Sequence, residues 1–475
     1  MRILFVFQSP EYVRNYESTL RELNREKHVI FLSSMPQKKR DNPMKRARLD
    51  PTGWGLSIAH NVGAVPCRKG RVNRIKHRLR GIVDFLRFLH PDYAMAVHLR
   101  ERMKLKSLDA WLSVLDKLPT LPPRLLRGLV SALCRLDAAL PTDRLTLDFL
   151  RGHEPDLVVV TPLVVAASPQ VEVVHAAKEL NIPVAVCIAS WDNLTNKGLL
   201  KCLPDKVFVW NADQRREAAR YHYVPRERVE ITGAPLFDRW FDARPEASYE
   251  SYCRTTSLHD DRPYVLYVGS SNAIAPNDDE ILFVQRWIRA LRTSGSELLR
   301  NAGVLIRPHP YNYFAWESVD LEMLENVSIW PRSTPVLASE SNQQDLFHAI
   351  FHSAAVVGIN TSVMIEAAII GRRVFTIETE EFARGQRETL HFNYLLSEQG
   401  GIATAARNLD EHCRQLERAL DDGQDAPDYT AFIERFVRPA GLRQSASRVL
   451  AAKLVDLGEG TESSGAARQR EVVPV

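Results

Sequence analysis

A polar turn inside an otherwise apolar segment is the first feature of this chain that could do chemistry. Residues 355–377 read AVVGINTSVMIEAAIIGRRVFTI, with Asn360, Thr361, Ser362 and Glu366 in the middle. A membrane-spanning helix needs ~20 mostly apolar residues without such interruptions. The pattern instead predicts a strand over 354–359, a helix over 362–370 and a strand over 373–378. A helix that starts directly after a strand points free N–H groups at the carboxyl edge of the sheet, where anions bind. The alternative is that the polar residues only cap the helix and Glu366 is solvated.

Two further strand ends in the same half carry residues suited to phosphate. The stretch VLIRPHP ends a predicted strand with Arg307 and His309, held in a turn by prolines. The stretch YVLYVGSS ends another with Gly269, Ser270 and Ser271, whose small size lets backbone N–H groups approach a phosphate closely. Three such turns in one domain predict a site for a nucleotide diphosphate. The chain has no Walker loop and no GxGxxG after a strand, which disfavours P-loop ATPases and ordinary dinucleotide dehydrogenases.

Strand ends in the first half of the chain offer candidates for proton transfer and sugar contact. Asp192, in the stretch SWDNLTNKG, is a candidate general base, although an Asp in such a turn more often caps a helix. Glu11, after the first predicted strand, is a second candidate. Four side chains nearby are predicted to contact an acceptor, or else to cover the edge of the core: Trp191, Asn193, Trp210 and Asn211.

Alternation of strands and helices positions these turns in two domains. An N-terminal Rossmann-like domain over residues 1–240 contains a helical insertion at about 37–150, and a second Rossmann-like domain spans 260–455. Residues 456–475 have the composition of a disordered tail. We expect an α/β protein with two doubly wound domains facing across a cleft.

Composition narrows the class of protein. The chain has 475 residues, of which 45% are hydrophobic and 25% charged, as in ordinary soluble proteins. Its six cysteines are scattered without a CxxC pair, which disfavours a zinc ribbon or disulfide scaffold and favours the cytosol. The start MRILFVF reads as a first strand and is too short for a signal peptide.

Positive charge is concentrated in residues 37–106, where 18 Lys or Arg stand against 5 Asp or Glu, a net charge of +13. We expect this basic segment to meet an anionic membrane or a polyanionic acceptor, or else to form a solvated helical face. Nucleic acid is disfavoured because no RNA-binding motif or zinc finger accompanies the charge. The expected location is the cytoplasm, with peripheral contact at the inner face of the membrane.

The motifs RPHP and GINTSVMIEAAIIGRRVFTI together resemble the C-terminal domain of GT-B glycosyltransferases, notably capsule and surface-polysaccharide transferases and the CDP-glycerol glycerophosphotransferase group. The phrases SWDNLTNKG, WNADQRREA and ITGAPLFD resemble the N-terminal half of bacterial proteins with that architecture. The resemblance covers residues 1–10 and most of 150–455. It implies that His309, Thr361 and Ser362 hold the donor diphosphate and Glu366 the ribose hydroxyls. It also implies that the stretch FARGQRETLHFNYL closes over the donor, with Gln386 and His391 nearest.

The expected function is therefore transfer of a sugar from a nucleotide-activated donor to a surface-glycan or lipid-linked acceptor. No metal or cofactor is expected, because helix N–H groups, Arg and His can stabilise the leaving diphosphate. A nucleotide-sugar epimerase of the UDP-N-acetylglucosamine 2-epimerase type is the first alternative, although the acidic-Gly-Gly turn of that group is absent from the sequence. A polyol-phosphate transferase, whose corresponding turn reads GINTS here, and a non-catalytic GT-B binding domain are the others.

Overall fold

The computed structural model describes residues 1–37, 49–51, 54–68, 70–319, 324–331, 340–421 and 427–460. The chain forms two compact units. Unit 1 comprises residues 1–238 and 434–475, and unit 2 comprises residues 239–433. The predicted domain limits at 240 and 260 lie near this division, whereas residues 434–455 group with unit 1.

Unit 1 is built on a seven-stranded parallel sheet in the order β3-β2-β1-β4-β5-β6-β7. Its strands are β1 (Arg2–Phe7), β2 (Val29–Ser34), β3 (Ala59–Ala64), β4 (Leu157–Thr161), β5 (Val184–Cys187), β6 (Lys206–Val209) and β7 (Val229–Ile231). Its helices are α1 (Glu17–Arg25), α2 (Arg71–Leu86), α3 (Val97–Ser107), α4 (Pro123–Ala139), α5 (Arg144–His153), α6 (Gln170–Glu179), α7 (Asn193–Asn196), α8 (Ala212–His222) and α18 (Ala446–Glu459). The order 3-2-1-4 reverses between β1 and β4, as in a Rossmann fold.

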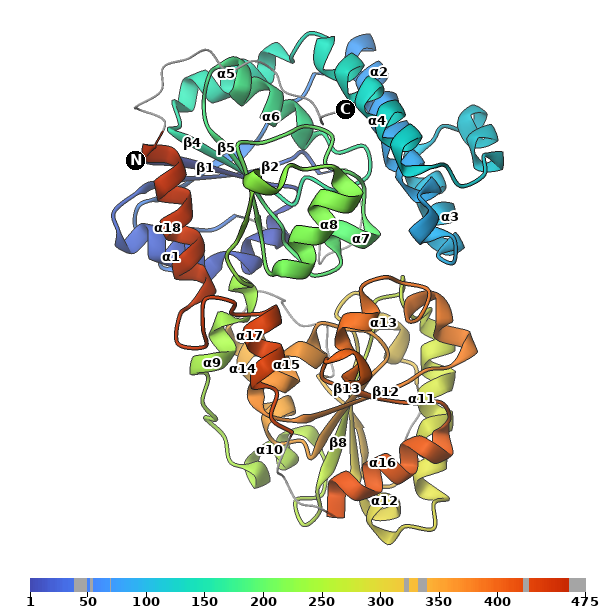
Figure 1. Cartoon of the computed structure of the whole chain (residues 1–475). Helices are drawn as coiled ribbons and strands as arrows, with labels where there is room; N and C mark the ends of the chain where they lie inside the picture. The colour runs from blue at the N-terminus through green and yellow to red at the C-terminus, as the bar shows by residue number, and fades with distance from the viewer. Residues whose placement is uncertain are drawn as a thin grey trace. The chain divides into compact units, whose positions relative to one another are not determined.

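Alternate residues of β1 show how the sheet is covered on both faces. Ile3, Phe5 and Phe7 belong to one buried cluster with residues of α1 and α18, while Leu4 and Val6 belong to another with residues of α5 and α6. Figure 1 shows α1 and α18 together on one side of this sheet and α5 and α6 on the other. Strands buried on both faces explain the continuous apolar runs in the sequence.

Unit 2 repeats the plan with a six-stranded parallel sheet in the order β10-β9-β8-β11-β12-β13. Its strands are β8 (Tyr264–Val268), β9 (Gly303–Arg307), β10 (Val327–Ile329), β11 (Ala355–Gly358), β12 (Arg373–Ile377) and β13 (Ala403–Ala406). Its helices are α10 (Tyr249–Thr256), α11 (Asn277–Arg292), α12 (Glu297–Asn301), α13 (Tyr313–Trp316), α14 (Glu340–Phe351), α15 (Val363–Ile370) and α16 (Leu409–Asp421). Two short helices, α9 (Asp238–Asp242) and α17 (Thr430–Phe436), carry the chain across the division between the units.

The prediction of two Rossmann-like doubly wound α/β domains is confirmed, and the strand–helix–strand unit at 355–377 has its predicted form. The helical insertion begins later than predicted, because β3 pairs with β2 and belongs to the sheet. From residue 71 to 153 the chain is helical, with α2, α3, η6 (Ala110–Lys117), α4 and α5. Residues 456–459 of the predicted tail belong to α18, and 461–475 lie outside the described residues.

Candidate functional site

The carboxyl edge of the sheet in unit 2 gathers four loops. The order of this sheet reverses between β8 and β11, and ligands of open α/β sheets bind outside the strand ends at such a point. The loop after β8 starts at Gly269, whose N–H donates to the Arg307 carbonyl at the end of β9 (2.9 Å). A Cβ at Gly269 would lie 2.7 Å from the backbone nitrogen of His309, so only glycine lets these two loops touch.

Buried polar groups join the loops into one framework. The Asn312 side chain donates to the Ser270 carbonyl (2.9 Å), and the Asn360 N–H donates to the Ser270 hydroxyl (3.3 Å). The Asn360 amide then donates to the carbonyl of Gly385, in the loop after β12 (2.6 Å). The structure thus brings together the three turns that the sequence singled out, and Ser270 and Asn360 are buried in the joint between them.

Glu280, in the first turn of α11, lies beneath this framework and was not among the predicted residues. Its side chain is fully buried, and Oε1 accepts from the Ser270 N–H (2.8 Å) and the Tyr267 hydroxyl (3.2 Å). Burial raises the pKa of Glu280 to about 8, against the hydrogen bonds from Ser270 and Tyr267 that lower it. The acidic run NDDE at a helix start resembles ordinary capping, so nothing in the sequence signals this role.

Four of the predicted donor-site residues are partly exposed at this edge: Ser271, His309, Thr361 and Ser362. Ser362 occupies the N-cap position of α15, and its side chain makes no capping hydrogen bond in the described structure. Glu366 lies in the first turn of that helix and is buried. A polar turn at a helix N-terminus, with an imidazole from the neighbouring loop, is suited to an anion.

Three other predicted donor-site residues are buried and engaged within the protein. The Arg307 guanidinium pairs with Asp345 on α14 and donates to Asn342 (2.9 Å). The Gln386 amide donates to the carbonyls of Ile359 (3.1 Å) and Ile377 (3.0 Å), and His391 is 2% exposed. Their predicted contact with a donor stays a prediction, and the bonds of Arg307 and Gln386 give them a clear structural role.

At the carboxyl edge of the sheet in unit 1, the two candidate bases lie around one phenol. Burial, together with the charges of Asp192 and Glu11, raises the pKa of Tyr12 to about 12. Glu11 also accepts from the Ser9 hydroxyl (2.8 Å). Asp192 lies 3.6 Å from the Lys197 ammonium and accepts from the Asn193 side chain (3.1 Å). Within the described ranges, no group of three or more His, Cys, Asp or Glu side chains is placed to hold a metal ion.

The four residues predicted to contact an acceptor are buried. Trp210 donates to the Ile188 carbonyl (3.0 Å), and Trp191 packs edge-on against Phe436. Asn211 caps α8 by accepting from the Gln214 N–H (3.0 Å), and Asn193 accepts from the Ala189 N–H (3.3 Å). Contact with a sugar stays a prediction for these residues, while the structure shows them holding the ends of β5 and β6.

The helical insertion reaches this edge through two arginines, of which Arg87 is buried and Arg102 is partly buried. Arg87 donates to the carbonyls of Lys197 and Gly198 (both 2.8 Å), and Arg102 donates to Asn196. Burial lowers the pKa of Arg102, with the charge of Asp192 opposing that shift. The insertion therefore supports the loop that carries Asp192, a role that the sequence did not reveal.

Several charges of the basic segment are not available to an external partner. Lys76 and Arg80 are almost fully buried and pair with Glu172 (2.7 and 2.8 Å), and Arg80 also pairs with Asp137 (3.0 Å). Burial alone would raise the pKa of Glu172, but Arg80 and Lys76 outweigh it and lower the pKa to about 2. The expectation that this whole segment forms one basic surface is wrong for these residues, and 38–48 lie outside the described residues.

Solved structures with the same fold cover nearly the whole chain. The UDP-GlcNAc 2-epimerase of Methanocaldococcus jannaschii, in complex with UDP-GlcNAc and UDP, superposes with a TM-score of 0.51 at 10% identity, over 96% of this chain and 99% of that one. The UDP-GlcNAc 2-epimerase of Neisseria meningitidis, bound to UDP-GlcNAc, gives 0.50 at 11% identity, over 96% and 100%. A glycosyltransferase of Rickettsia africae gives 0.50 at 10% identity, over 98% and 99%. No protein-family model and no curated protein matches the sequence.

The chain has the GT-B fold. The resemblance to GT-B proteins is thus confirmed at the level of the fold, but not for the capsule or CDP-glycerol transferase group. The prediction of a glycosyltransferase is wrong as the leading function, because solved structures of UDP-GlcNAc 2-epimerases superpose on nearly the whole chain. The phosphate-type motifs could not separate the two kinds of enzyme, because one fold can host more than one function.

Proposed function

We propose that this protein is a nucleotide-sugar epimerase of the UDP-GlcNAc 2-epimerase type. The observation that carries the proposal is the joined set of loops at the switch point of unit 2, with Thr361 and Ser362 at the start of α15 and His309 from the next loop. Such an edge suits a nucleotide diphosphate. The likeness over nearly the full chain to epimerases bound to UDP-GlcNAc supports the same substrate class.

Epimerisation by proton exchange inverts one stereocentre when one group removes a proton from the carbon and another returns a proton to its opposite face. In unit 1, Asp192 is our first candidate for proton removal and Glu11 our second. Tyr12, whose pKa of about 12 keeps it protonated at neutral pH, is a third proton-carrying group beside them. Arg87 and Arg102 act here as positioning residues, because they hold the loop that carries Asp192.

The direct test is to incubate the protein with UDP-GlcNAc in D₂O and follow the sugar by NMR. We expect the 2-epimer to form and solvent deuterium to appear at the inverted carbon, because a base that exchanges with solvent returns deuterium. Addition of EDTA should leave the rate unchanged, since the proposed diphosphate site uses N–H groups and imidazole rather than a metal ion.

Asp192→Asn keeps the shape of the side chain but removes the proton acceptor, so turnover should fall by about 10²–10⁴-fold while nucleotide binding survives. Arg300→Gln, an exposed change in α12, is the matched control and should be neutral. Release of free UDP without epimer, or no conversion of UDP-, GDP- or CDP-sugars, would overturn the proposal.

A further inference from the structure

Exposed apolar side chains are concentrated on the helical insertion of unit 1. Of the fifteen large hydrophobic residues that are exposed in the described structure, three lie in unit 2, namely Leu282, Leu298 and Phe314. The other twelve lie between residues 72 and 145: Val72, Ile75, Met95, Val97, Leu105, Trp111, Val114, Leu118, Leu125, Leu129, Leu136 and Leu145. Single exposed apolar residues are normal, but a concentration of exposed apolar residues marks an interaction surface.

Helix α4 shows that these residues form a face rather than scatter. Leu125, Leu129 and Leu136 are 52%, 41% and 56% exposed, and their spacing of four and seven residues puts them on one side of the helix. Little more than a quarter of a turn around the same helix, Leu126 and Val130 are buried in a cluster with Val83 and Phe85 of α2. The apolar surface of α4 is therefore wider than the part that α2 covers, and the described part of this protein leaves the rest exposed.

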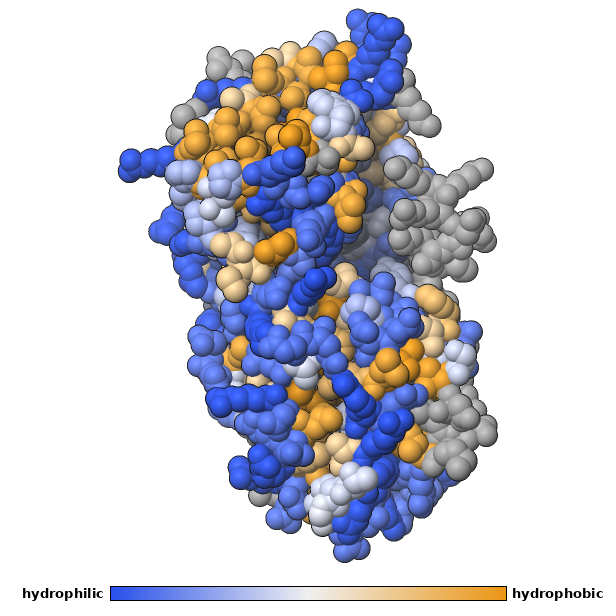
Figure 2. Space-filling view, turned by 90° about the vertical axis from the view of Figure 1, so that its right-hand side faces the viewer, coloured by the Kyte–Doolittle hydropathy of each residue, from blue (hydrophilic) through white to orange (hydrophobic). Residues whose placement is uncertain are grey.

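Further exposed apolar residues lie on α2 and η6. Arg78 on α2 pairs with Asp109 (2.7 Å) and lies over the Trp111 ring (6.0 Å), so η6 packs beside the turn of α2 that carries Ile75. Figure 2 shows the outcome: a continuous hydrophobic area over the upper part of the molecule, bordered by hydrophilic residues. We call this area, with the charged residues around it, the insertion face.

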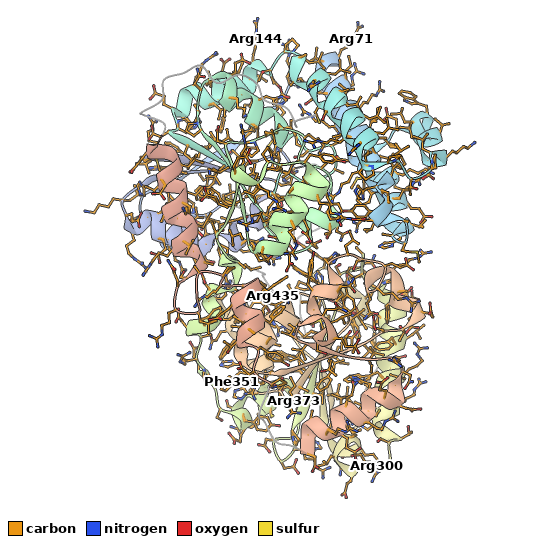
Figure 3. All side chains as sticks on the ribbon, viewed as in Figure 1. Arg71, Arg144, Arg300, Phe351, Arg373 and Arg435 are labelled. Atoms are coloured by element: carbon orange, nitrogen blue, oxygen red, sulfur yellow. The ribbon has the colours of Figure 1, made fainter. Side chains whose placement is uncertain are left out.

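The border of the insertion face is strongly positive. Among residues 71–145, the exposed basic side chains are Arg71, Arg74, Arg78, Lys106, Lys117, Arg124, Arg135 and Arg144. The exposed acidic ones in the described residues are Glu101 and Asp109, so the net charge of this set is 8 − 2 = +6. Arg71 and Arg144 project outward from the upper end of unit 1 (Figure 3).

We propose that the insertion face docks unit 1 on an anionic lipid bilayer. Leucines and an exposed Trp enter the interfacial region, and the surrounding arginines and lysines meet lipid phosphates. None of the helices in the described part of the chain is both long and apolar enough to cross a membrane, so this contact is peripheral. A second copy of the chain fits the face poorly, because a two-fold contact would set the same positive border against itself.

The insertion face differs in its residues from the basic segment at 37–106. Lys76 and Arg80 are buried, and the apolar part of the face lies mostly beyond residue 106. The test of lipid docking is independent of the proposed epimerase activity, because lipid binding can be measured without substrate.

The experiment is sedimentation of the full chain with vesicles of neutral phosphatidylcholine, with or without about 30 mol% phosphatidylglycerol. We expect retention on the anionic vesicles at about 0.1 M salt and release at about 1 M, where screening is nearly complete. The triple variant Leu125→Gln, Leu129→Gln, Leu136→Gln should bind at least about 10-fold more weakly, because three apolar contacts are lost. The triple variant Arg124→Gln, Arg135→Gln, Arg144→Gln should bind about 100-fold more weakly. Each arginine removed is expected to lower the affinity for anionic lipid by roughly tenfold or less.

The matched control is Leu282→Gln, Leu298→Gln, Phe314→Gln, which removes equally exposed apolar residues from unit 2 and should leave retention unchanged. All substituted side chains are exposed, so folding should survive, and circular dichroism checks this. Equal retention of the Leu125 triple variant and the control triple variant would overturn the proposal. Absence of retention of the wild-type chain on the anionic vesicles at about 0.1 M salt would also overturn it. If the chain is then a dimer that the Leu125 triple variant dissociates, the face is assigned to a second copy.

Discussion

Gly269 stands where two loops of unit 2 touch. A Cβ at this position would come within 2.7 Å of the His309 nitrogen and 3.2 Å of the Pro308 backbone, neither of which is the end of a flexible side chain. Gly269→Ala should therefore move the turn that carries His309, cost about 1–3 kcal/mol of stability and weaken UDP binding roughly 10-fold. Thermal unfolding with and without UDP measures both effects. Gly295→Ala, with no atom within 4 Å of the new Cβ, is the control and should change neither.

Glu280 makes a different residue-scale prediction, in pH dependence. The ordinary pKa of its carboxyl is 4.5, and burial raises the folded-state value to about 8. Between these values the folded protein holds a proton that the unfolded chain has lost, so the stability from this group falls as pH rises from about 4.5 to about 8. Glu280→Gln cannot titrate and should show a flatter pH profile in urea unfolding between about pH 5 and 8. Parallel profiles for wild type and variant would contradict the assignment.

The side chains at the two sheet edges show what spacing could and could not predict. Ser270 and Asn360 follow strands that the apolar runs define well, and the structure brings them together as those runs imply. The ion-pair partner of Arg307 could not be predicted from the sequence, because Asp345 is 38 residues away on another element. Nor can spacing say whether a Trp faces solvent, and Trp191 and Trp210 turn out to be buried.

At the scale of elements, the insertion is attached to the sheet of unit 1 by buried ion pairs between α2 and α6. Glu172 on α6 accepts from both Lys76 and Arg80, each nearly fully buried. Glu172→Gln would leave those cations without their carboxylate and should destabilise unit 1 by about 3–5 kcal/mol. Glu101→Gln, an exposed change on α3, is the control and should lie within about 0.5 kcal/mol of wild type.

The same carboxylate predicts acid sensitivity. Because Arg80 and Lys76 lower the pKa of Glu172 from 4.5 to about 2, the unfolded chain binds a proton first, and the stability from this group is lost as pH falls from about 4.5 to about 2. The Glu172→Gln variant should lose less stability than wild type over that window in urea unfolding. This is opposite in sign to Glu280, so the two variants serve as controls for each other.

Elements with a continuous apolar run could be predicted closely, and the others could not. The strand β11 and helix α15 match the boundaries expected from residues 355–377 to within one residue. Strand β3 reads AHNVGA, is only partly buried and lies at the sheet edge, so its single Val is too weak a strand signal. Strand β10 is three residues long and also an edge strand. These two edge strands are recognised by the strands with which they pair rather than by their own sequence.

For the whole molecule, the chain leaves unit 1 at Asp238 and returns to it at Glu434. The Asp238 carboxylate accepts from the Arg438 guanidinium (2.7 Å), the Ser445 hydroxyl (2.8 Å) and the Ser447 N–H (2.7 Å). The segment that leaves unit 1 and the segment that returns to it are therefore joined at the buried Asp238 carboxylate. The Asp238 side chain is 7% exposed. The returning segment ends in α18, whose Leu450 and Leu454 complete the core against β1.

Asp238→Ala should therefore weaken unit 1 selectively. It would leave Arg438 buried without its carboxylate, at a cost of about 3–5 kcal/mol, while the core of unit 2 keeps all its contacts. Differential scanning calorimetry should show the transition of unit 1 at lower temperature and that of unit 2 unchanged. UDP should raise only the midpoint temperature of the unit 2 transition, because the proposed diphosphate site lies at the sheet edge of unit 2. Asp242→Ala, an exposed change four residues on, is the control. A shift by UDP of the weakened transition instead would place nucleotide binding in unit 1 and contradict the assignment of the diphosphate site.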